Sequence, residues 1–514
     1  MFLQKMNPKN TQLLLLVGCL FVLIGLLFSK AILSLSTAYL ILLFILFGNY
    51  SEGFIRIQKN ISLLLFILFI GFYITSLFWS KLIISGLSDL LSKGNLILLP
   101  IILVALPVLS NKNKAIILQL FAGLVIIESC INFSNFYLNY SPDKDIRTMS
   151  LFVSHIRFSL FVVFALCILA YQKIAKISTN ILRWMGIVWL LFYIYYAQVL
   201  SGVLALLICI FVSLILGIKS THKRVVMYSL IVLTAIISSL GVFIFNTSSN
   251  EKINIQAYPT HTKLGHLYFH DTTSNATENG YPLHCFINEK ELDSTWKTKS
   301  TIALTSLTKN NFNYHTVLIR YLTSKGLTKD AEGINKLSNQ DIKNIELGIP
   351  TILSLQTGLQ NRLNELHYQL NCFENPNGHS ILQRLEYWKT GWSIFKKNWF
   401  IGTGIGDYKE AYQTEYMNLN SLLQQKNRLE SHNQFLGIAI ATGSVGLLLF
   451  LLHLTYTFRI FWQKKEVIPV LFLSICISSF LVEDTLTTLA GMSFFSFFIG
   501  LFLTNNSIKN EVNN

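Results

Sequence analysis

Several long stretches of this chain carry no charged residue, and this pattern constrains the fold more than any other feature. The clearest examples are Leu13–Phe28, Ile61–Trp79 and Val225–Phe245. A helix needs about 20 mostly apolar residues to cross the hydrocarbon core of a bilayer. Charged residues make up only 13% of the chain, whereas soluble domains carry about 25%. The sequence therefore predicts an all-α polytopic membrane protein.

The apolar runs predict about twelve membrane-spanning helices, nine before a long polar segment and three after it. In chain order, the expected spans are 11–28, 31–48, 60–79, 93–110, 115–138, 151–171, 181–199, 201–218, 225–246, 433–456, 466–483 and 485–504. We accordingly expect a transmembrane bundle at 1–246, one large extracytoplasmic loop domain of mixed structure at 247–432, and three final spans with a tail at 433–514.

The distribution of basic residues predicts the orientation in the membrane. Alternate short loops are rich in Lys and Arg, for example at Arg56 and Lys59 and again at Arg459, whereas the connection near residue 484 is the acidic pair Glu483-Asp484. Because cytoplasmic loops carry the excess of Lys and Arg, both termini are expected in the cytoplasm and the large loop outside. The net charge of +15 belongs to this bias, and no nucleic-acid-binding motif accompanies it.

The large loop is expected to have two parts. Residues 247–300 alternate polar, aromatic and turn residues, which predicts a few strands, whereas 342–370 shows helical spacing with a break at 348–350. The segment 381–397 predicts an amphipathic helix that lies either on the membrane surface or within a small outer domain. Cys285 and Cys372 would be able to pair in an oxidising compartment, and the sequence leaves their state open.

Two arginines in this pattern are candidates for binding an anion. His155 and Arg157 lie together at the start of a span that is otherwise free of charge, where an arginine is costly unless it meets an anion, a carboxylate or water. Arg384 lies in the predicted amphipathic helix, close to Trp388, and its planar guanidinium suits phosphate oxygens. The alternatives are snorkelling of Arg157 to the interface and a salt bridge from Arg384 to Glu386 or another neighbour.

The end of the large loop supplies a third candidate group. Arg428 precedes Ser431-His432-Asn433 at the point where the chain re-enters the membrane. His432 would act as a general base toward a hydroxyl or hydrogen-bond a phosphate oxygen. Alternatively, it is an interfacial histidine beside a helix cap. The glycine-rich stretch 402–406 is better explained by a tight turn than by an anion-binding loop.

The sequence favours neither a metal-binding site nor a proton-coupled transporter. Four histidines of the polar segment lack the spacing of a zinc site: His261, His266, His270 and His284. A proton-coupled transporter usually keeps paired carboxylates in its spans, and Glu128 is the one clear acidic residue in the apolar runs. We expect neither a metal nor a cofactor.

Together, these features resemble the O-antigen ligase and O-antigen polymerase superfamily of bacterial membrane glycosyltransferases. The motifs that carry the resemblance are Arg384–Trp388, Asn398–Gly406, and Ser431–Leu436 with Gly443 and Gly446, all within 380–455. One departure is Leu200, which stands where many members of the superfamily have an arginine.

The resemblance implies transfer of a glycan from undecaprenyl diphosphate to an acceptor hydroxyl, the lipid A core in the ligases, on the periplasmic face of the bacterial inner membrane. It nominates Arg157, Arg384 and His432 as catalytic without a metal. From their positions beside these residues, we expect His155, Trp388, Arg428 and Asn433 to bind the substrate. A polymerase or a protein O-glycosyltransferase is the alternative within this chemistry, and a polysaccharide-lipid transporter is the alternative outside it. The single large outer loop favours the ligase.

Overall fold

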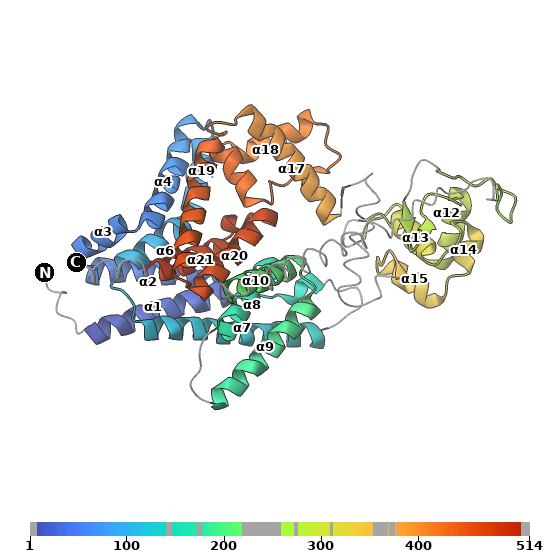
Figure 1. The fold of residues 1–514 in the computed structure, drawn as a ribbon. Coiled ribbons are helices and arrows are strands. Elements are labelled where there is room, and N and C mark those ends of the chain that lie inside the picture. Colours follow the sequence, from blue (N-terminus) through green and yellow to red (C-terminus); the bar gives the residue numbers. More distant parts are fainter. Residues whose placement is uncertain are drawn as a thin grey trace.

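The computed structural model describes residues 8–139, 146–171, 177–217, 259–271, 276–308, 312–352, 369, 376–377 and 379–504. Within this part of the chain the protein is mainly helical with very little sheet, and most of the helices form one apolar bundle (Figure 1). The expected all-α membrane class is confirmed by these apolar helices.

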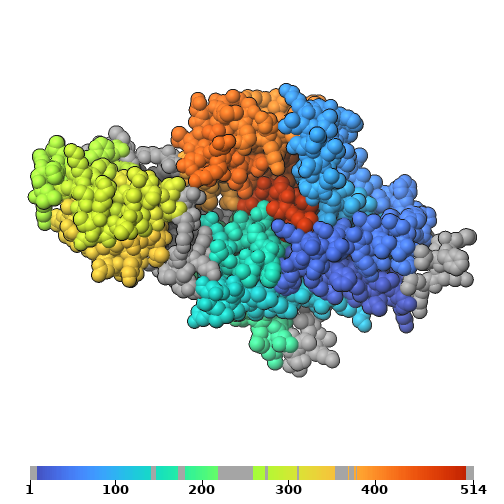
Figure 2. Space-filling view, turned by 180° about the vertical axis from the view of Figure 1, so that it is seen from behind, coloured from blue at the N-terminus to red at the C-terminus, as the bar shows by residue number. Residues whose placement is uncertain are grey.

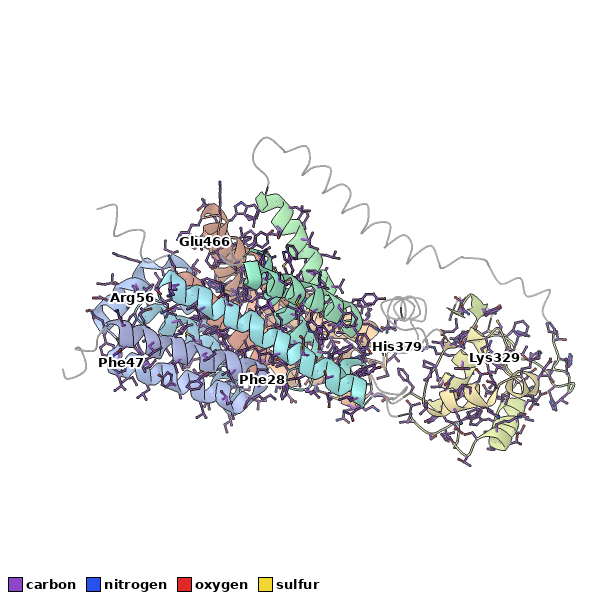
Figure 3. All side chains as sticks on the ribbon, turned by 90° about the horizontal axis from the view of Figure 1, so that it is seen from below. Phe28, Phe47, Arg56, Lys329, His379 and Glu466 are labelled. Carbon is purple, nitrogen blue, oxygen red and sulfur yellow. The ribbon has the colours of Figure 1, made fainter. Side chains whose placement is uncertain are left out.

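The first part of the bundle is a series of helices joined by short turns. The elements are α1 (Pro8–Phe28), α2 (Lys30–Phe47), α3 (Tyr50–Lys59), α4 (Ile61–Thr75), η1 (Ser76–Trp79), α5 (Ile83–Ser92), α6 (Gly94–Ala105), α7 (Asn111–Leu138), η2 (Ile146–Met149), α8 (His155–Tyr171), α9 (Ile177–Ala197) and α10 (Leu200–Gly217). The α1–α2 pair is a tight hairpin, with the labelled Phe28 and Phe47 at opposite ends (Figure 3).

Six described helices are long and apolar enough to cross a membrane, and a seventh span is possible if α5 and α6, which meet at a bend of 45°, act as one. Three further apolar helices are shorter: α8, α20 (Val467–Val482) and α21 (Leu489–Leu503). Helices occupy eleven of the twelve ranges expected from the sequence, and the remaining one, 225–246, lies outside the described residues. The total of twelve spans therefore stays a prediction.

The described residues within 259–352 form a small domain with its own core, drawn as the yellow and green lobe in Figure 2. Its elements are β1 (Thr277–Glu278), β2 (Tyr281–Pro282), α12 (Glu289–Lys299), α13 (Tyr314–Ser324), α14 (Ala331–Asn335) and α15 (Asn339–Glu346). The expected strands shrink to one antiparallel pair of two-residue strands in the described residues, because burial falls mainly on helices around Trp296 and Tyr321. Helix α15 ends before Gly348, where φ is +80°.

Two other expectations for the large loop have different outcomes. Cys285 is buried in the small domain, but Cys372 lies outside the described residues, so their pairing stays a prediction. The same holds for the proposed domain border at residues 246 and 247. The expected amphipathic helix at 381–397 is observed as α17 (Ser380–Lys397).

The helices and loops after residue 379 pack on the bundle and carry most of the candidate site. Helix α17 packs on α18 (Tyr408–Asn418) and on α19 (Gln434–Gln463), and the short η6 (Gln425–Asn427) and η7 (Thr485–Thr487) lie in the connections. In turn, α19 packs on α4 and α20, and α21 packs on α6. Phenylalanine rings from α7, α8, α20 and α21 pack against one another between these four helices; the ring centroids of Phe161 and Phe494, for example, lie 4.6 Å apart.

Helix α19 is broken at Gly443, where φ is +66° and ψ is −167°. The preceding loop satisfies the backbone groups that the break frees. Thr403 N–H donates to Ile440 O at 2.8 Å, Gly404 N–H donates to Ala441 O at 2.9 Å, and Ser444 N–H donates to Trp399 O at 2.7 Å. The glycine-rich stretch 402–406 is thus a close-packed turn against α19, as its preferred interpretation predicts.

Candidate functional site

Two adjacent carboxylates, Glu483 and Asp484, form the centre of the candidate site. They lie in the short connection between α20 and η7, at one end of the bundle. The Glu483 side chain is 2% exposed and that of Asp484 is 16% exposed. A carboxylate buried to this degree requires compensating positive charge or hydrogen-bond donors.

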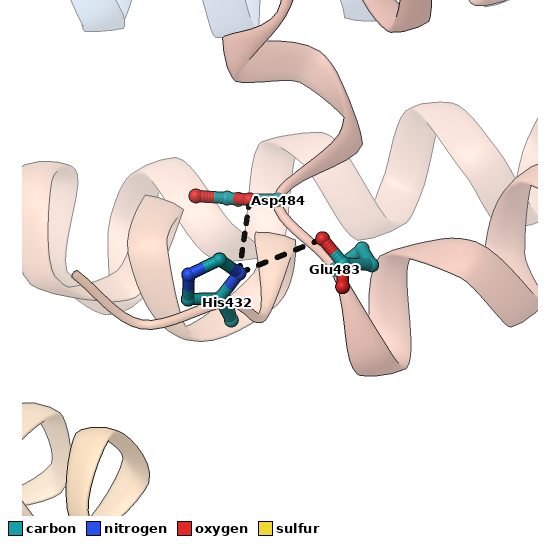
Figure 4. Close-up of side chains that lie close together, drawn as sticks. All are labelled: His432, Glu483 and Asp484. Carbon is teal, nitrogen blue, oxygen red and sulfur yellow. Dashed lines mark ion pairs between the residues drawn. The ribbon is translucent and has the colours of Figure 1, made fainter. Parts of the chain in front are cut away.

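Three cationic or titratable side chains surround these carboxylates. Nη2 of Arg157 lies 3.4 Å from Glu483 Oε2 and 3.6 Å from Asp484 Oδ1. Arg384 makes a close ion pair with Glu483. Figure 4 shows the His432 ring beside both carboxylates, with Nδ1 at 3.5 Å from Glu483 and 3.8 Å from Asp484. The fold therefore brings the three residues nominated as catalytic, from α8, α17 and the start of α19, to one pair of carboxylates.

The conformation of His432 is fixed by the loop that carries it. The φ angle of His432 is +43°, a region that non-glycine residues adopt only when their surroundings impose it. The His432 ring stacks on Tyr387, with centroids 5.4 Å apart and planes 26° apart. The Tyr387 hydroxyl donates to Asn427 O at 2.9 Å, and the Tyr416 hydroxyl donates to Leu429 O at 2.6 Å. These tyrosines hold the loop in place.

The two residues after His432 join this loop to the connection that carries the carboxylates. The side chain of Asn433 caps α19 by accepting from Leu436 N–H at 2.9 Å, and it donates to Leu481 O at 2.8 Å. The side-chain oxygen of Gln434 accepts from Leu486 N–H at 2.8 Å. The spacing of the His-Asn-Gln motif thus positions Glu483 and Asp484 beside the histidine. Asn433 makes structural contacts, and its expected role in substrate binding stays a prediction.

The other residues nominated for substrate binding lie around the centre. Arg428 donates through Nε to Leu423 O at 3.0 Å, and its guanidinium carbon lies 5.9 Å from the centre of the Tyr416 ring. Trp388 is half-buried against the tyrosine cluster of α17 and α18, and its indole N–H has no hydrogen-bond partner among the described residues. His155, the first residue of α8, lines a small separate pocket with Tyr193. Among the described ion pairs of Glu483 and Asp484, none involves Arg428, Trp388 or His155.

The centre retains unused hydrogen-bonding capacity. Within the described part of the chain, Arg157 Nε, His432 Nδ1 and Glu483 Oε2 are buried and lack a hydrogen-bond partner, because the ion pairs of the last two are longer than hydrogen bonds. Each guanidinium has five N–H donors in a planar fork. The site is therefore able to donate several hydrogen bonds to the oxygens of an anion such as a phosphate.

The neighbouring charges shift the pKa values of His432 and Glu483 in opposite directions. Burial alone would lower the pKa of His432, but Glu483 and Asp484 raise it above its ordinary value. Burial alone would raise the pKa of Glu483, whereas His432, Arg157 and Arg384 hold it below its ordinary value. The arrangement favours a protonated His432 facing an ionised Glu483.

The same residues include a set of possible metal ligands. One ligand atom each from His432, Glu483 and Asp484 lie within 4.8 Å of one another. However, Arg157 and Arg384 contact Glu483, and their positive charges oppose a cation there. The donor set therefore fits a divalent metal poorly, and the absence of a metal from the mechanism stays a prediction.

The sequence analysis missed the carboxylates as site residues. Glu483 and Asp484 entered it only as an acidic outer loop, although two adjacent carboxylates between two apolar spans signal a cationic partner elsewhere in the fold. The one acidic residue singled out within the spans, Glu128, is completely buried in α7, and neither of its carboxylate oxygens has a hydrogen-bond partner among the described residues.

The fold and the site define a multi-span helical membrane protein in which two arginines and a histidine surround a pair of carboxylates at the end of the bundle. Residues 346–451 match the family model described as O-antigen ligase. The match supports the O-antigen ligase superfamily, and the resemblance predicted from the motifs is thereby confirmed. The comparison with curated proteins gave no match.

The matched segment includes α17, α18 and the first part of α19, and hence Arg384 and His432. Arg157, Glu483 and Asp484 lie outside it, and only the tertiary structure connects them to the motif. The family supports an enzyme, a ligase or polymerase acting on lipid-linked glycans, in a multi-pass bacterial membrane protein.

Proposed function

We propose that this protein transfers a glycan from undecaprenyl diphosphate to an acceptor hydroxyl, the lipid A core, on the periplasmic face of the bacterial inner membrane. The observation that carries the proposal is the convergence of Arg157, Arg384 and His432 on one pair of carboxylates. A diphosphate leaves readily when donors stabilise its developing charge. The unused N–H groups of the two arginines are suited to this task.

In the proposed reaction, the acceptor oxygen forms a bond to the anomeric carbon of the glycan. The bond between that carbon and the diphosphate oxygen breaks, and undecaprenyl diphosphate leaves with the electron pair. Because the neighbouring carboxylates raise the pKa of His432, we assign this side chain to the phosphate oxygens rather than to the hydroxyl proton. The proton then passes to a carboxylate. Asp484 is the more accessible of the two, at 16% against 2% exposed for Glu483.

Arginine-to-lysine variants test the role of the guanidinium fork. Arg157→Lys and Arg384→Lys keep the charge but lose the planar donors, and we expect each to lower the rate of transfer about 100-fold or more. The measurement uses purified protein in vesicles with the lipid-linked glycan and lipid A core. Arg459→Lys, at an exposed position of α19, is the matched control and should retain wild-type activity. Wild-type rates in both site variants would refute the assignment.

Binding of the diphosphate should depend on pH through His432. When this histidine is protonated, three positive side chains face two carboxylates, and when it is neutral the charges cancel. We therefore expect affinity for undecaprenyl diphosphate to be highest near and below the ordinary histidine pKa of 6.5 and to fall as the pH rises through the raised value. The protonated His432 ring also stabilises the folded protein, and this contribution is likewise lost as the pH rises through the raised pKa.

Equilibrium binding of undecaprenyl diphosphate to the detergent-solubilised protein across this pH range checks the expectation. In a His432→Gln variant the dependence should flatten, because no titrating group remains at that position. An unchanged pH profile in this variant would assign the titration to another group.

The alternatives are separated by the glycans that accumulate in a deletion strain. Long chains retained on the lipid carrier beside bare lipid A core indicate a ligase, and core carrying a single repeat indicates a polymerase. Unchanged lipopolysaccharide and precursors would favour a protein O-glycosyltransferase. A transporter would instead move the lipid-linked glycan in vesicles that contain no acceptor.

A further inference from the structure

A cavity of about 330 Å³ lies beside the carboxylate pair. It is bounded by α4, by the bend between α5 and α6, and by the starts of α18 and α19. Small-molecule pockets in proteins typically measure about 300–1,000 Å³, so the volume suits one or two sugar rings. The apolar part of the wall includes Phe69, Leu96 and Ile438.

The polar part of the wall differs in charge from the arginine centre. It carries three carboxylates and two lysines: Asp89, Glu430 and Asp484 with Lys93 and Lys409. Lys93 Nζ lies 2.5 Å from Asp89 Oδ1, and the Tyr73 hydroxyl donates to the other oxygen of Asp89 at 2.6 Å. With more carboxylates than lysines, the cavity disfavours a diphosphate, whereas carboxylates and tyrosines are good partners for sugar hydroxyls.

Asp484 belongs both to the cavity wall and to the centre. Its Oδ1 atom lies 3.6 Å from Arg157 Nη2 and 3.8 Å from His432 Nδ1. Neither arginine of the centre lines the cavity. A sugar in the cavity would therefore meet the centre at Asp484, where a hydroxyl reaches a carboxylate and the proposed diphosphate position at once.

We propose that this cavity is the acceptor subsite and that it takes a terminal sugar that is uncharged or carries an amino group, but not one that is phosphorylated. The inference rests on the proposed glycan transfer and specifies its acceptor. The Lys93–Asp89 pair forms the recognition surface at the far wall, and Asp484 receives the hydroxyl that attacks. The apolar wall packs against the non-polar face of the sugar.

The kinetic test uses purified full-length protein in vesicles, undecaprenyl-diphosphate-linked glycan as donor and lipid A core as acceptor. Lys93→Met and Asp89→Asn should each raise the KM for the acceptor about tenfold, because a hydrogen bond to a charged group is lost, while the KM for the donor stays within about twofold. Lys81→Met, an exposed lysine that does not line the cavity, is the matched control. A rise confined to the donor KM, or no change in either KM, would overturn the proposal.

A second measurement does not depend on transfer. Ser92 lines the cavity, and a Ser92→Cys variant is labelled with a maleimide, with the unaltered protein as background. Methyl glucoside should slow the labelling, and its 6-phosphate should not. Protection by undecaprenyl diphosphate alone would assign the cavity to the donor and refute the acceptor subsite. Protection by the glucoside in a protein that transfers no glycan would refute the proposed function but keep the sugar site.

Discussion

Replacing Glu483 by glutamine is expected to abolish glycan transfer and to destabilise the protein by about 3–5 kcal/mol. The Glu483 side chain is 2% exposed and forms ion pairs with Arg157, Arg384 and His432. An uncharged amide would leave buried positive charges with less compensation, and removing one partner of a buried ion pair is strongly destabilising. The arginines would also lose the carboxylate that orients them toward the proposed diphosphate position.

Thermal unfolding in detergent and transfer assays in vesicles measure the two effects. Glu52→Gln is the matched control, because Glu52 is 64% exposed in its pair with Arg56 and such surface pairs contribute about 0–1 kcal/mol. If Glu483→Gln unfolds at the wild-type temperature and retains transfer, the carboxylate does not organise the centre.

The second large effect is expected at the break in α19. Gly443 has φ +66° and ψ −167°, a combination open essentially only to glycine. An added Cβ would lie 2.1 Å from Phe400 O, so Gly443→Ala requires the loop 399–404 or the helix to move. We expect a loss of about 3 kcal/mol or more of stability and a loss of transfer, because the first half of α19 follows His432.

Gly123→Ala is the control for this substitution. Gly123 lies within α7, and an added Cβ there meets no atom within 4 Å. Alanine should therefore stabilise the helix by about 0.5–1 kcal/mol. Unfolding temperatures of the two variants in the same detergent test the contrast. Equal behaviour would mean that the break in α19 imposes no constraint on residue 443.

The helices were predictable because each apolar run satisfies its backbone hydrogen bonds locally. The site was only partly predictable. Arg157, Arg384 and His432 were each conspicuous, since a charged or titratable group at the edge of an apolar span needs a partner. Their common partner, Glu483, could not be predicted, because the salt bridge considered for Arg384 from the sequence was to Glu386, which is close to it along the chain. In the fold, Glu386 instead accepts from Ser421 at 2.9 Å.

The small domain shows a second reason why the sequence did not predict all of the structure. The alternation in 247–300 predicted strands, whereas the core of the small domain lies mainly on its helices, and Phe269 and Tyr281 of the alternating segment are exposed. Alternation of polar and apolar residues over a short segment indicates that every second side chain is buried. It does not distinguish a strand from an irregular loop. The expected helix at 381–397, with its longer pattern, was found.

By itself, the sequence determined the membrane class, most helix positions and the motifs of the O-antigen ligase superfamily, because these depend on local hydrophobicity and on spacing along one segment. The tertiary structure alone decided that α8, α17, α19 and the α20–η7 connection meet at Glu483 and Asp484. It also placed Lys93 and Asp89 across a cavity from Asp484. The physical reason is that a buried charge specifies only that it needs a counter-charge, and packing of distant helices determines which residue supplies it.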